Sequence, residues 1–224
     1  MYPDRFYYPE LPAGVPRDLD WSNNGKGAYL PLAVAVKAAG VTVPVISAAR
    51  LDPVLGEQAL REGKIDFVGM TRRILADPEL PRKVMEGRLE DIRPCLGCLY
   101  CMDVRLENKY VMCRVNPQIN REREISYEPA KKKKKVLIIG GGPAGMEAAR
   151  VAATRGHDVF LYDKQPGLGG LIPRAALIKD VEADDLTALV KWFTRQLNHL
   201  GVKIKLGTEV TPSIIKRLKP DAVI

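Results

Sequence analysis

The chain has 224 residues, of which 46% are apolar and 28% charged, as is typical of a globular protein with an ordinary core. No apolar run approaches the roughly 18 residues of a membrane-spanning helix, and the first residues lack the apolar stretch of a secretory signal, so we expect a cytoplasmic protein without a membrane partner. The net charge of +8 falls to about +3 without the five lysines of residues 131–135, which we interpret as a solvated linker rather than a nucleic-acid footprint.

The first third of the chain predicts alternating helices and strands. Residues 1–28 are rich in Pro, Tyr, Gly and Asn and predict irregular structure, and a short helix is expected over about 30–39. Two short β-branched, apolar runs at 43–47 and 65–69 are typical of buried strands. A helix over about 52–62 separates them, with Pro53 in its first turn and Gly63 at its end, and another short helix is expected at about 80–86. This order predicts parallel strands.

Basic residues follow both of these strands. Arg50 comes after the first strand, and Thr71, Arg72 and Arg73 come after the second. The ends of adjacent parallel strands can hold a cofactor phosphate through basic side chains and free backbone N–H groups. The pattern therefore suggests a phosphate site, although arginines at such places are also common as surface charges.

All four cysteines of the chain lie within nineteen residues, at positions 95, 98, 101 and 113. Three thiolates at two-residue gaps and a fourth further along are typical of a cubane iron–sulfur cluster. Two alternatives stay open at this point, a structural zinc site and four thiols without metal, although zinc sites usually show two separated C-x2-C pairs. We expect the segment of about 93–120 to be a loop organised by metal.

The last third predicts a second α/β unit. Strands are expected at 136–139, 158–163 and 202–206, and helices at 143–154 and about 186–200, with Gly156 ending the first helix. Residues 221–224 read as one more strand. Because the chain stops there, with only part of a dinucleotide fold in place, we expect a fragment of a longer protein.

Glycines between the first strand and helix of this unit form a dinucleotide fingerprint. Gly140 permits a tight turn, Gly142 lets a pyrophosphate approach, and Gly145 lets the helix lie close to the strand. Asp163, at the end of the second strand, is placed to bind ribose hydroxyls. A second glycine-rich turn at 167–170 favours FAD over NAD, and the alternative is a glycine turn that serves only helix packing.

Several segments resemble the multidomain relatives of old yellow enzyme, a group that includes 2,4-dienoyl-CoA reductase, 2-enoate reductase and trimethylamine dehydrogenase. They are residues 44–53, 66–78, 92–98, 113–117 and 140–145, in the family's order. The resemblance implies an α/β fold in three parts. Residues 1–92 would be the C-terminal part of an FMN-binding TIM barrel, 93–130 a [4Fe–4S] segment, and 131–224 the first part of a Rossmann-like FAD/NAD(P)-binding domain.

The same resemblance assigns residues to cofactors. Arg50, Thr71 and Arg72 would contact the FMN phosphate, and Cys95, Cys98, Cys101 and Cys113 would ligate the cluster. The residues expected to hold FAD are Gly140, Gly142, Ala144, Gly145, Asp163, Lys164, Gly170 and Val210. Ala49 and Thr71 stand where the family usually has glycine, and Asp163 stands in place of the usual glutamate. The family's substrate-side proton donor lies outside this chain, so no catalytic residue is assigned.

The function implied is that of an NAD(P)H-dependent flavoprotein acting on a small-molecule enoate or enoyl-CoA. Electrons would pass from NAD(P)H through FAD and the cluster to FMN. An amine dehydrogenase of the same family, and an electron-transfer module with cluster and FAD that serves a separate catalytic partner, are the alternatives. A zinc-stabilised nucleic-acid-binding protein is a third hypothesis, and a homo-oligomer is compatible with all of them.

Overall fold

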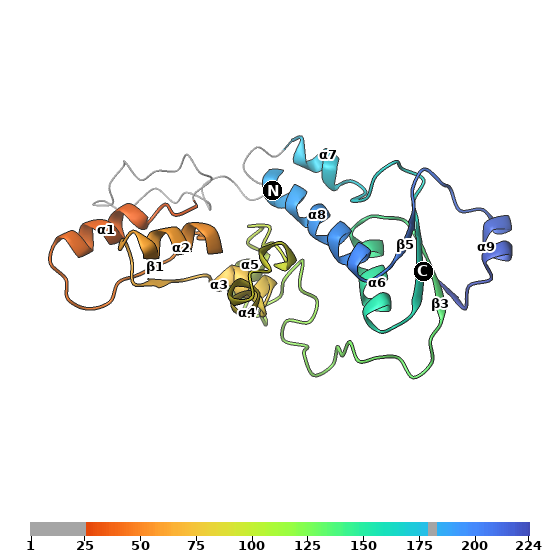
Figure 1. Ribbon diagram of the computed structural model, residues 1–224, viewed down its shortest axis with the longest axis horizontal. Coiled ribbons are helices and arrows are strands. Elements are labelled where there is room, and N and C mark those ends of the chain that lie inside the picture. Colours follow the sequence, from red (N-terminus) through yellow and green to blue (C-terminus); the bar gives the residue numbers. More distant parts are fainter. Residues whose placement is uncertain (1–25, 179–182) are drawn as a thin grey trace. The chain divides into compact units, whose positions relative to one another are not determined.

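The computed structural model describes residues 26–178 and 183–224, so nearly all of the irregular segment predicted at 1–28 lies outside the described residues. The chain divides into two compact units. The first unit ends at Thr71, and the second unit runs from Arg72 to Ile224 (Figure 1). Both are mixed α/β with parallel strands, as the sequence predicts.

The described part of the first unit contains one β–α–β crossover. Helix α1 (Leu30–Ala38) precedes strand β1 (Ile46–Ser47), helix α2 (Pro53–Arg61) and strand β2 (Phe67–Val68). The two strands pair in parallel, with Ile46 opposite Phe67. A small core of Ala33, Leu51, Ala59 and Ile65 lies between the helices and the strands.

The ends of α2 follow from its sequence. The Asp52 carboxylate accepts the Leu55 N–H at 2.9 Å, which satisfies one of the free donors of the first turn. Pro53 occupies the first helical position, where it has no hydrogen bond to lose. Gly63 follows the C-cap residue in a left-handed conformation, with φ +67°, and this ends the helix.

The second unit begins with short helices. They are α3 (Thr71–Ala76, which starts on the last residue of the first unit), α4 (Leu80–Met85), the 3₁₀ helix η2 (Leu89–Asp91) and α5 (Tyr100–Leu106). The prediction of a loop over 93–120 is therefore wrong for α5. Leu99 takes a left-handed conformation at the helix N-terminus, and Val104 is buried, so a tertiary contact stabilises a helix too short to show a period.

A parallel sheet forms the rest of the second unit. In the described residues its strand order is β5-β4-β3-β6, and α6 and α8 lie on one side of it with α9 on the other (Figure 1). The elements are β3 (Lys135–Ile139), α6 (Pro143–Thr154), β4 (Asp158–Tyr162), α7 (Ile172–Ala176), α8 (Ala183–His199), β5 (Lys203–Lys205), α9 (Pro212–Leu218) and β6 (Ala222–Val223).

The structure adds three details to the sequence prediction. Lys135 belongs to β3, and its Nζ donates to the Leu218 carbonyl at 3.1 Å, so within the lysine run only residues 131–134 are exposed. Strand β6 is at the edge of the sheet, with Val223 46% exposed. Helices α7 and α9 have no counterpart in the prediction.

The core of the second unit lies between the sheet and helices α6 and α8. Ile138 and Leu161 are fully buried on neighbouring strands, and Met146 of α6 and Leu197 of α8 cover them. Each such side chain stabilises the fold by about 1.5–3 kcal/mol relative to an exposed one. Leu96 and Val115 of the cysteine segment pack against the same core, so that segment is attached to the sheet's helical side.

Among the described residues, no helix combines the length and apolar character that crossing a membrane requires.

Candidate functional site

The carboxyl ends of β3 and β4 form what we call the dinucleotide edge, residues 140–145 and 163–170. Ile139 and Tyr162 are partners in the parallel register, and the Gly140 N–H donates to the Tyr162 carbonyl at 2.8 Å. Gly140 and Asp163 are the next residues on the two strands. The structure therefore brings the glycine turn and the acidic residue to the same place.

Glycine is required at Gly145 by a close backbone approach. A Cβ added there would lie 1.9 Å from the Gly140 carbonyl oxygen. Gly142 is the N-terminal cap of α6 and carries no side-chain cap, so the first N–H groups of the helix have no side-chain acceptor there. Free N–H groups at a helix N-terminus favour a bound phosphate.

The second glycine turn lies against the first. The Gly169 N–H donates to the Gly141 carbonyl at 2.8 Å. A Cβ on Gly170 would stand 3.0 Å from the Cα of Gly142. The two glycine turns therefore pack backbone against backbone, while a Cβ built on Gly140 would meet no described atom within 4 Å. This glycine cradle leaves the open space at Gly140 for the pyrophosphate of a dinucleotide.

Asp163 is buried and binds the backbone of the first glycine turn and of the residues that follow β4. Its Oδ2 accepts the Gly141 N–H at 2.5 Å, and its Oδ1 accepts the Gln165 N–H at 2.7 Å. Each oxygen keeps a lone pair for a ribose hydroxyl. Lys164 and Ala144 are exposed, and the Thr208 N–H donates to the Asp163 carbonyl, which brings the stretch containing Val210 alongside Asp163.

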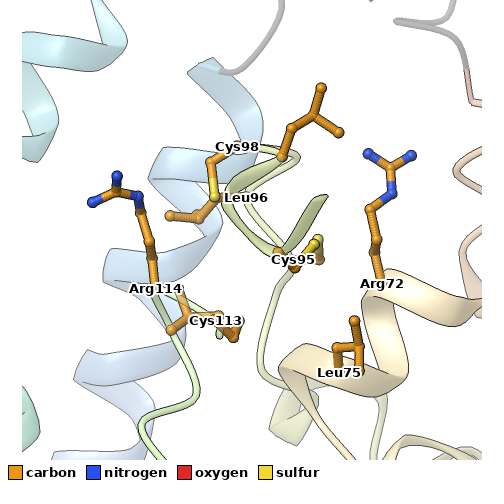
Figure 2. A pocket seen from close by; sticks show the side chains of 10 residues that line it. Arg72, Leu75, Cys95, Leu96, Cys98, Cys113 and Arg114 are labelled. Atoms are coloured by element: carbon orange, nitrogen blue, oxygen red, sulfur yellow. The ribbon is translucent and has the colours of Figure 1, made fainter. Parts of the chain in front are cut away.

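All four cysteines line one pocket, which we call the cysteine cavity. Figure 2 shows Cys95, Cys98 and Cys113 around it, with Arg72 on one side and Arg114 on the other. The four residues are free thiols. The space between the lining side chains, open solvent included, is about 340 Å³, and the other lining residues are Leu75, Leu96, Leu99, Cys101 and Val115.

Burial and charge act in opposite directions on these thiols. Burial raises the pKa of Cys95 and of Cys101 above the ordinary cysteine value, and the Arg72 guanidinium offsets part of that rise. A thiolate is the form that binds metal, so metal binding must displace the protons that burial favours. A nearby arginine makes that displacement easier.

The donor set fits an iron–sulfur cluster. A cubane needs four soft thiolate ligands in a largely apolar cavity, and the cysteine cavity supplies four thiols among leucines and a valine. Within residues 26–178 and 183–224, no three His, Cys, Asp or Glu side chains lie close enough to hold a single metal ion.

The three residues predicted for the FMN phosphate are in different units. Arg50 and Thr71 belong to the first unit, whereas Arg72 belongs to the second and lines the cysteine cavity. Ala49 and Arg50, the second and third residues after β1, both have positive φ, +78° and +55°. The backbone at Ala49 is therefore in the conformation that favours glycine, the residue the resembled family usually has there.

Sequence reasoning missed Arg93 and Trp192 as residues of this region. The Arg93 guanidinium lies 4.9 Å from the ring centre of Trp192, and its Nη1 donates to the Val115 carbonyl at 2.8 Å. Burial lowers the pKa of Arg93, and the neighbouring Arg150 charge lowers it further. No spacing rule connects residues 93, 115 and 192, and the position of Arg93 two residues before Cys95 is the only local signal.

Comparison with known proteins agrees with this geometry. Residues 135–216 match the FAD dependent oxidoreductase family. The chain is 45% identical over 201 residues to cinnamate reductase of Clostridium sporogenes, which covers 89% of this chain and 30% of that protein. It is 40% identical over 202 residues to N,N-dimethylglycine/sarcosine dehydrogenase of Chromohalobacter salexigens, covering 88% and 28%.

A solved structure gives the same result for the fold. The complex of 2-naphthoyl-CoA reductase with 2-naphthoyl-CoA superposes with a TM-score of 0.83 at 40% identity, covering 88% of this chain and 30% of that one. The chain thus spans about 30% of the length of the relatives it matches. On sequence and fold together, it belongs to the multidomain flavoprotein oxidoreductases related to old yellow enzyme.

Proposed function

We propose that this chain is part of an iron–sulfur flavoprotein that transfers electrons between NAD(P)H and a small-molecule enoate or enoyl-CoA. In this proposal residues 1–92 contribute to an FMN-binding barrel, 93–130 hold a [4Fe–4S] cluster, and 131–224 begin the FAD domain. When bound, FAD would accept hydride, the cluster would carry single electrons, and FMN would exchange hydride with the substrate.

The observation that carries the proposal is that four free thiols line one cavity in the same unit as the glycine cradle. The cysteine segment packs through Leu96 and Val115 on the core that also supports the dinucleotide edge. A cluster and a flavin bound to one compact unit have a fixed separation, which electron transfer requires. Neither site alone distinguishes an oxidoreductase from a structural metal site or a simple nucleotide-binding domain.

The chain's own residues would hold the cofactors rather than take part in bond breaking. Gly140 and Gly142 would leave room for the pyrophosphate, while Gly145 and Gly170 let neighbouring backbone segments approach closely. Asp163 holds the first glycine turn and would offer lone pairs to the ribose. Ala144, Lys164 and Val210 would border the bound nucleotide.

Around the cluster, Cys95, Cys98, Cys101 and Cys113 would be the ligands. In the first unit, Arg50 and Thr71 would contact the FMN phosphate. Arg72 has a further role available at the cysteine cavity, where its positive charge favours the thiolate forms of Cys95 and Cys101. An arginine there would also offset the negative charge of a bound cluster.

An amine dehydrogenase is the second candidate for the whole protein. The observation that favours it is the 40% identity to N,N-dimethylglycine/sarcosine dehydrogenase, which is close to the 45% identity to cinnamate reductase. Both identities concern the cofactor-binding part, so they support the electron-transfer role more than either substrate. An electron-transfer module serving a separate catalytic partner would use the same cluster and FAD.

The test is an anaerobic preparation of the chain, analysed for iron, sulfide, zinc and flavin and by its visible spectrum. We expect about four iron and four sulfide per chain with a broad absorbance near 400 nm, together with bound FAD. A colourless protein with one zinc per chain would overturn the cluster assignment. The Cys113→Ser variant is the matched control, since it should lose iron while it keeps FAD.

A further inference from the structure

The fourth cysteine needs a tertiary contact to stay near the other three. Cys113 follows α5 and an exposed stretch that includes Tyr110 and Met112, and it lies in no helix or strand. It nevertheless lines the same cavity as Cys95, Cys98 and Cys101. Some contact between the two ends of the segment must therefore hold this arrangement.

Arg93 supplies such a contact. Its side-chain Nη1 donates to the Val115 carbonyl at 2.8 Å, so it joins a residue two before Cys95 to a residue two after Cys113. Its own backbone is held as well, because the Arg93 N–H donates to Asp77 Oδ2 at 2.7 Å. The buried Asp77 carboxylate also pairs with Lys83 at 2.6 Å, which fixes that acceptor in turn.

Trp192 of α8 positions the Arg93 guanidinium from the other side. The ring lies 4.9 Å from the guanidinium carbon and is only 5% exposed. Its Nε1 donates to the Asp91 carbonyl at 3.0 Å, so the indole cannot turn without losing a hydrogen bond. A planar guanidinium over an indole is a favourable cation–π contact.

The charge of Arg93 is otherwise weakly compensated. Among residues 26–178 and 183–224, no carboxylate forms an ion pair with Arg93, and the neighbouring Arg150 is paired with Glu147 at 2.7 Å. Placing a charged group in a partly buried position costs free energy unless the charge is paired or hydrogen-bonded. A contact that only filled space could be made by an apolar side chain at lower cost.

We infer that Arg93 is a positioning residue, which fixes Cys113 against the Cys95–Cys101 turn through Val115 and is itself held by Trp192. The role at the cluster rests on the proposed function, whereas the role in thiol spacing does not. The geometry of the cysteine cavity is thereby coupled to α8, the helix that covers the sheet of the dinucleotide edge.

The first experiment needs no metal. In the 224-residue chain with Cys98 and Cys101 changed to serine, Cys95 and Cys113 are the remaining thiols, and dibromobimane joins thiols that are close together. We expect the cross-linking yield to fall several-fold in Arg93→Met and to be unchanged in Arg105→Met, an exposed arginine of the same segment. Equal yields in these two variants would overturn the inference.

The second experiment uses the loaded chain with all four cysteines. The rate of bleaching near 400 nm by an iron chelator should rise several-fold in Arg93→Met, and less in Arg93→Lys, because lysine keeps the charge but loses the planar fork. Trp192→Phe should also lower the cross-linking yield and speed the bleaching. It is the second variant, which tests the inference if Arg93→Met does not fold. A lowered Tm with unchanged cross-linking and bleaching would mean a purely structural role and would contradict the inference.

The two proposals fail in different ways. A wild-type chain that takes up no iron and sulfide would overturn the proposed function, while the cross-linking yields would still decide the role of Arg93. If the wild type binds the cluster and Arg93→Met behaves like Arg105→Met in both readouts, the proposed function stands and the positioning role of Arg93 is overturned.

Discussion

The two units contain the same structural motif, a pair of parallel strands, in opposite surroundings. In the second unit Ile138 and Leu161 are register partners, and both are fully buried under α6 and α8. In the first unit Ile46 and Phe67 are register partners, yet they are 67% and 56% exposed. Parallel strands occur almost only where both faces are covered. The second unit therefore supplies its own cover, whereas the described part of the first unit does not.

This difference suggests that contacts within the second unit contribute more to its stability than contacts within the first unit contribute to its own. A buried strand pair contributes its transfer free energy to the unit that contains it, while an exposed pair contributes little. We expect the second unit to unfold as a cooperative transition of its own and the first to be the less stable of the two. Four tests, each with its own control or matched pair, address this comparison.

The largest effect is expected for Gly145→Val, which would destroy the cradle of the second unit. A Cβ at this position meets the Gly140 carbonyl at 1.9 Å, so α6 must move away from β3. We expect a loss of more than about 3 kcal/mol from the second unit and no measurable FAD binding. Thermal unfolding and flavin fluorescence titration measure the two effects.

Gly167→Ala is the control for this substitution. No atom of the described residues lies within 4 Å of a Cβ built on Gly167, and its φ is not positive, so the variant should bind FAD like the wild type. Wild-type FAD affinity in Gly145→Val would show that the turn does not carry the cofactor and would remove the glycine cradle from the site.

A pair of truncations compares the two strand pairs directly. Leu161→Ala removes a fully buried side chain from the second unit and should cost about 2–5 kcal/mol. Ile46→Ala removes an exposed side chain from the first unit and should change stability by no more than about 0.5 kcal/mol. Urea unfolding followed by circular dichroism measures both, and a similar cost for the two would contradict the comparison.

The same contrast explains how much of the fold was predictable. The strands at β3 and β4, helix α6 and the glycine turn were predicted correctly because their signals are local: a short apolar run, Pro143 at the helix start, and glycines at fixed offsets. The helices missed, α3, α5, α7 and α9, have five to seven residues each, too few to display a helical period. Leu99 in a left-handed conformation before α5 is not a residue that sequence would mark for that role.

The candidate site divides along the same line. The cysteines and glycines could be predicted as site residues because their spacing in the chain is typical of a cluster and of a dinucleotide site, and the structure brings the four cysteines to one cavity. The contact of Arg93 with Val115 spans 22 residues, and that of Trp192 with Asp91 spans 101. Only the tertiary fold brings such residues together, so no pattern within either segment could indicate them.

A smaller effect is expected for Ala49→Gly in the first unit. Ala49 has φ +78°, a left-handed conformation that costs an L-residue roughly 1–2 kcal/mol, and its carbonyl is held by the Gly27 N–H at 2.8 Å. Glycine removes that strain but adds entropy to the unfolded chain, so we expect a net gain of up to about 1 kcal/mol. Hydrogen exchange of the β1–β2 amides measures it.

Ala48→Gly is the matched control, because Ala48 has no positive φ and its replacement should only destabilise. A gain confined to Ala49→Gly, with the second unit unchanged, would confirm that the two units respond separately. A shift of both units by the same amount would mean that they unfold together.

The smallest effect is expected for the Asp91 carboxylate, which helps to attach η2 to α8 within the second unit. Its Oδ1 accepts from Arg195 Nε at 2.9 Å, and this hydrogen bond holds the pKa of Asp91 below the ordinary value of 3.8, with Arg88 adding to the effect and burial opposing it. A carboxyl whose pKa is lowered by folding stabilises the folded state above its unfolded pKa and loses that contribution as pH falls through the folded value. Wild type should therefore exceed Asp91→Asn in Tm at neutral pH, and the difference should shrink below about pH 4.

The control is Glu90→Gln, whose carboxylate pairs with the same Arg195 but is 75% exposed and should matter less at any pH. A Tm difference that stays constant into acid would show that Asp91 acts through its backbone carbonyl and Trp192 alone, and the attachment of η2 would then not depend on charge.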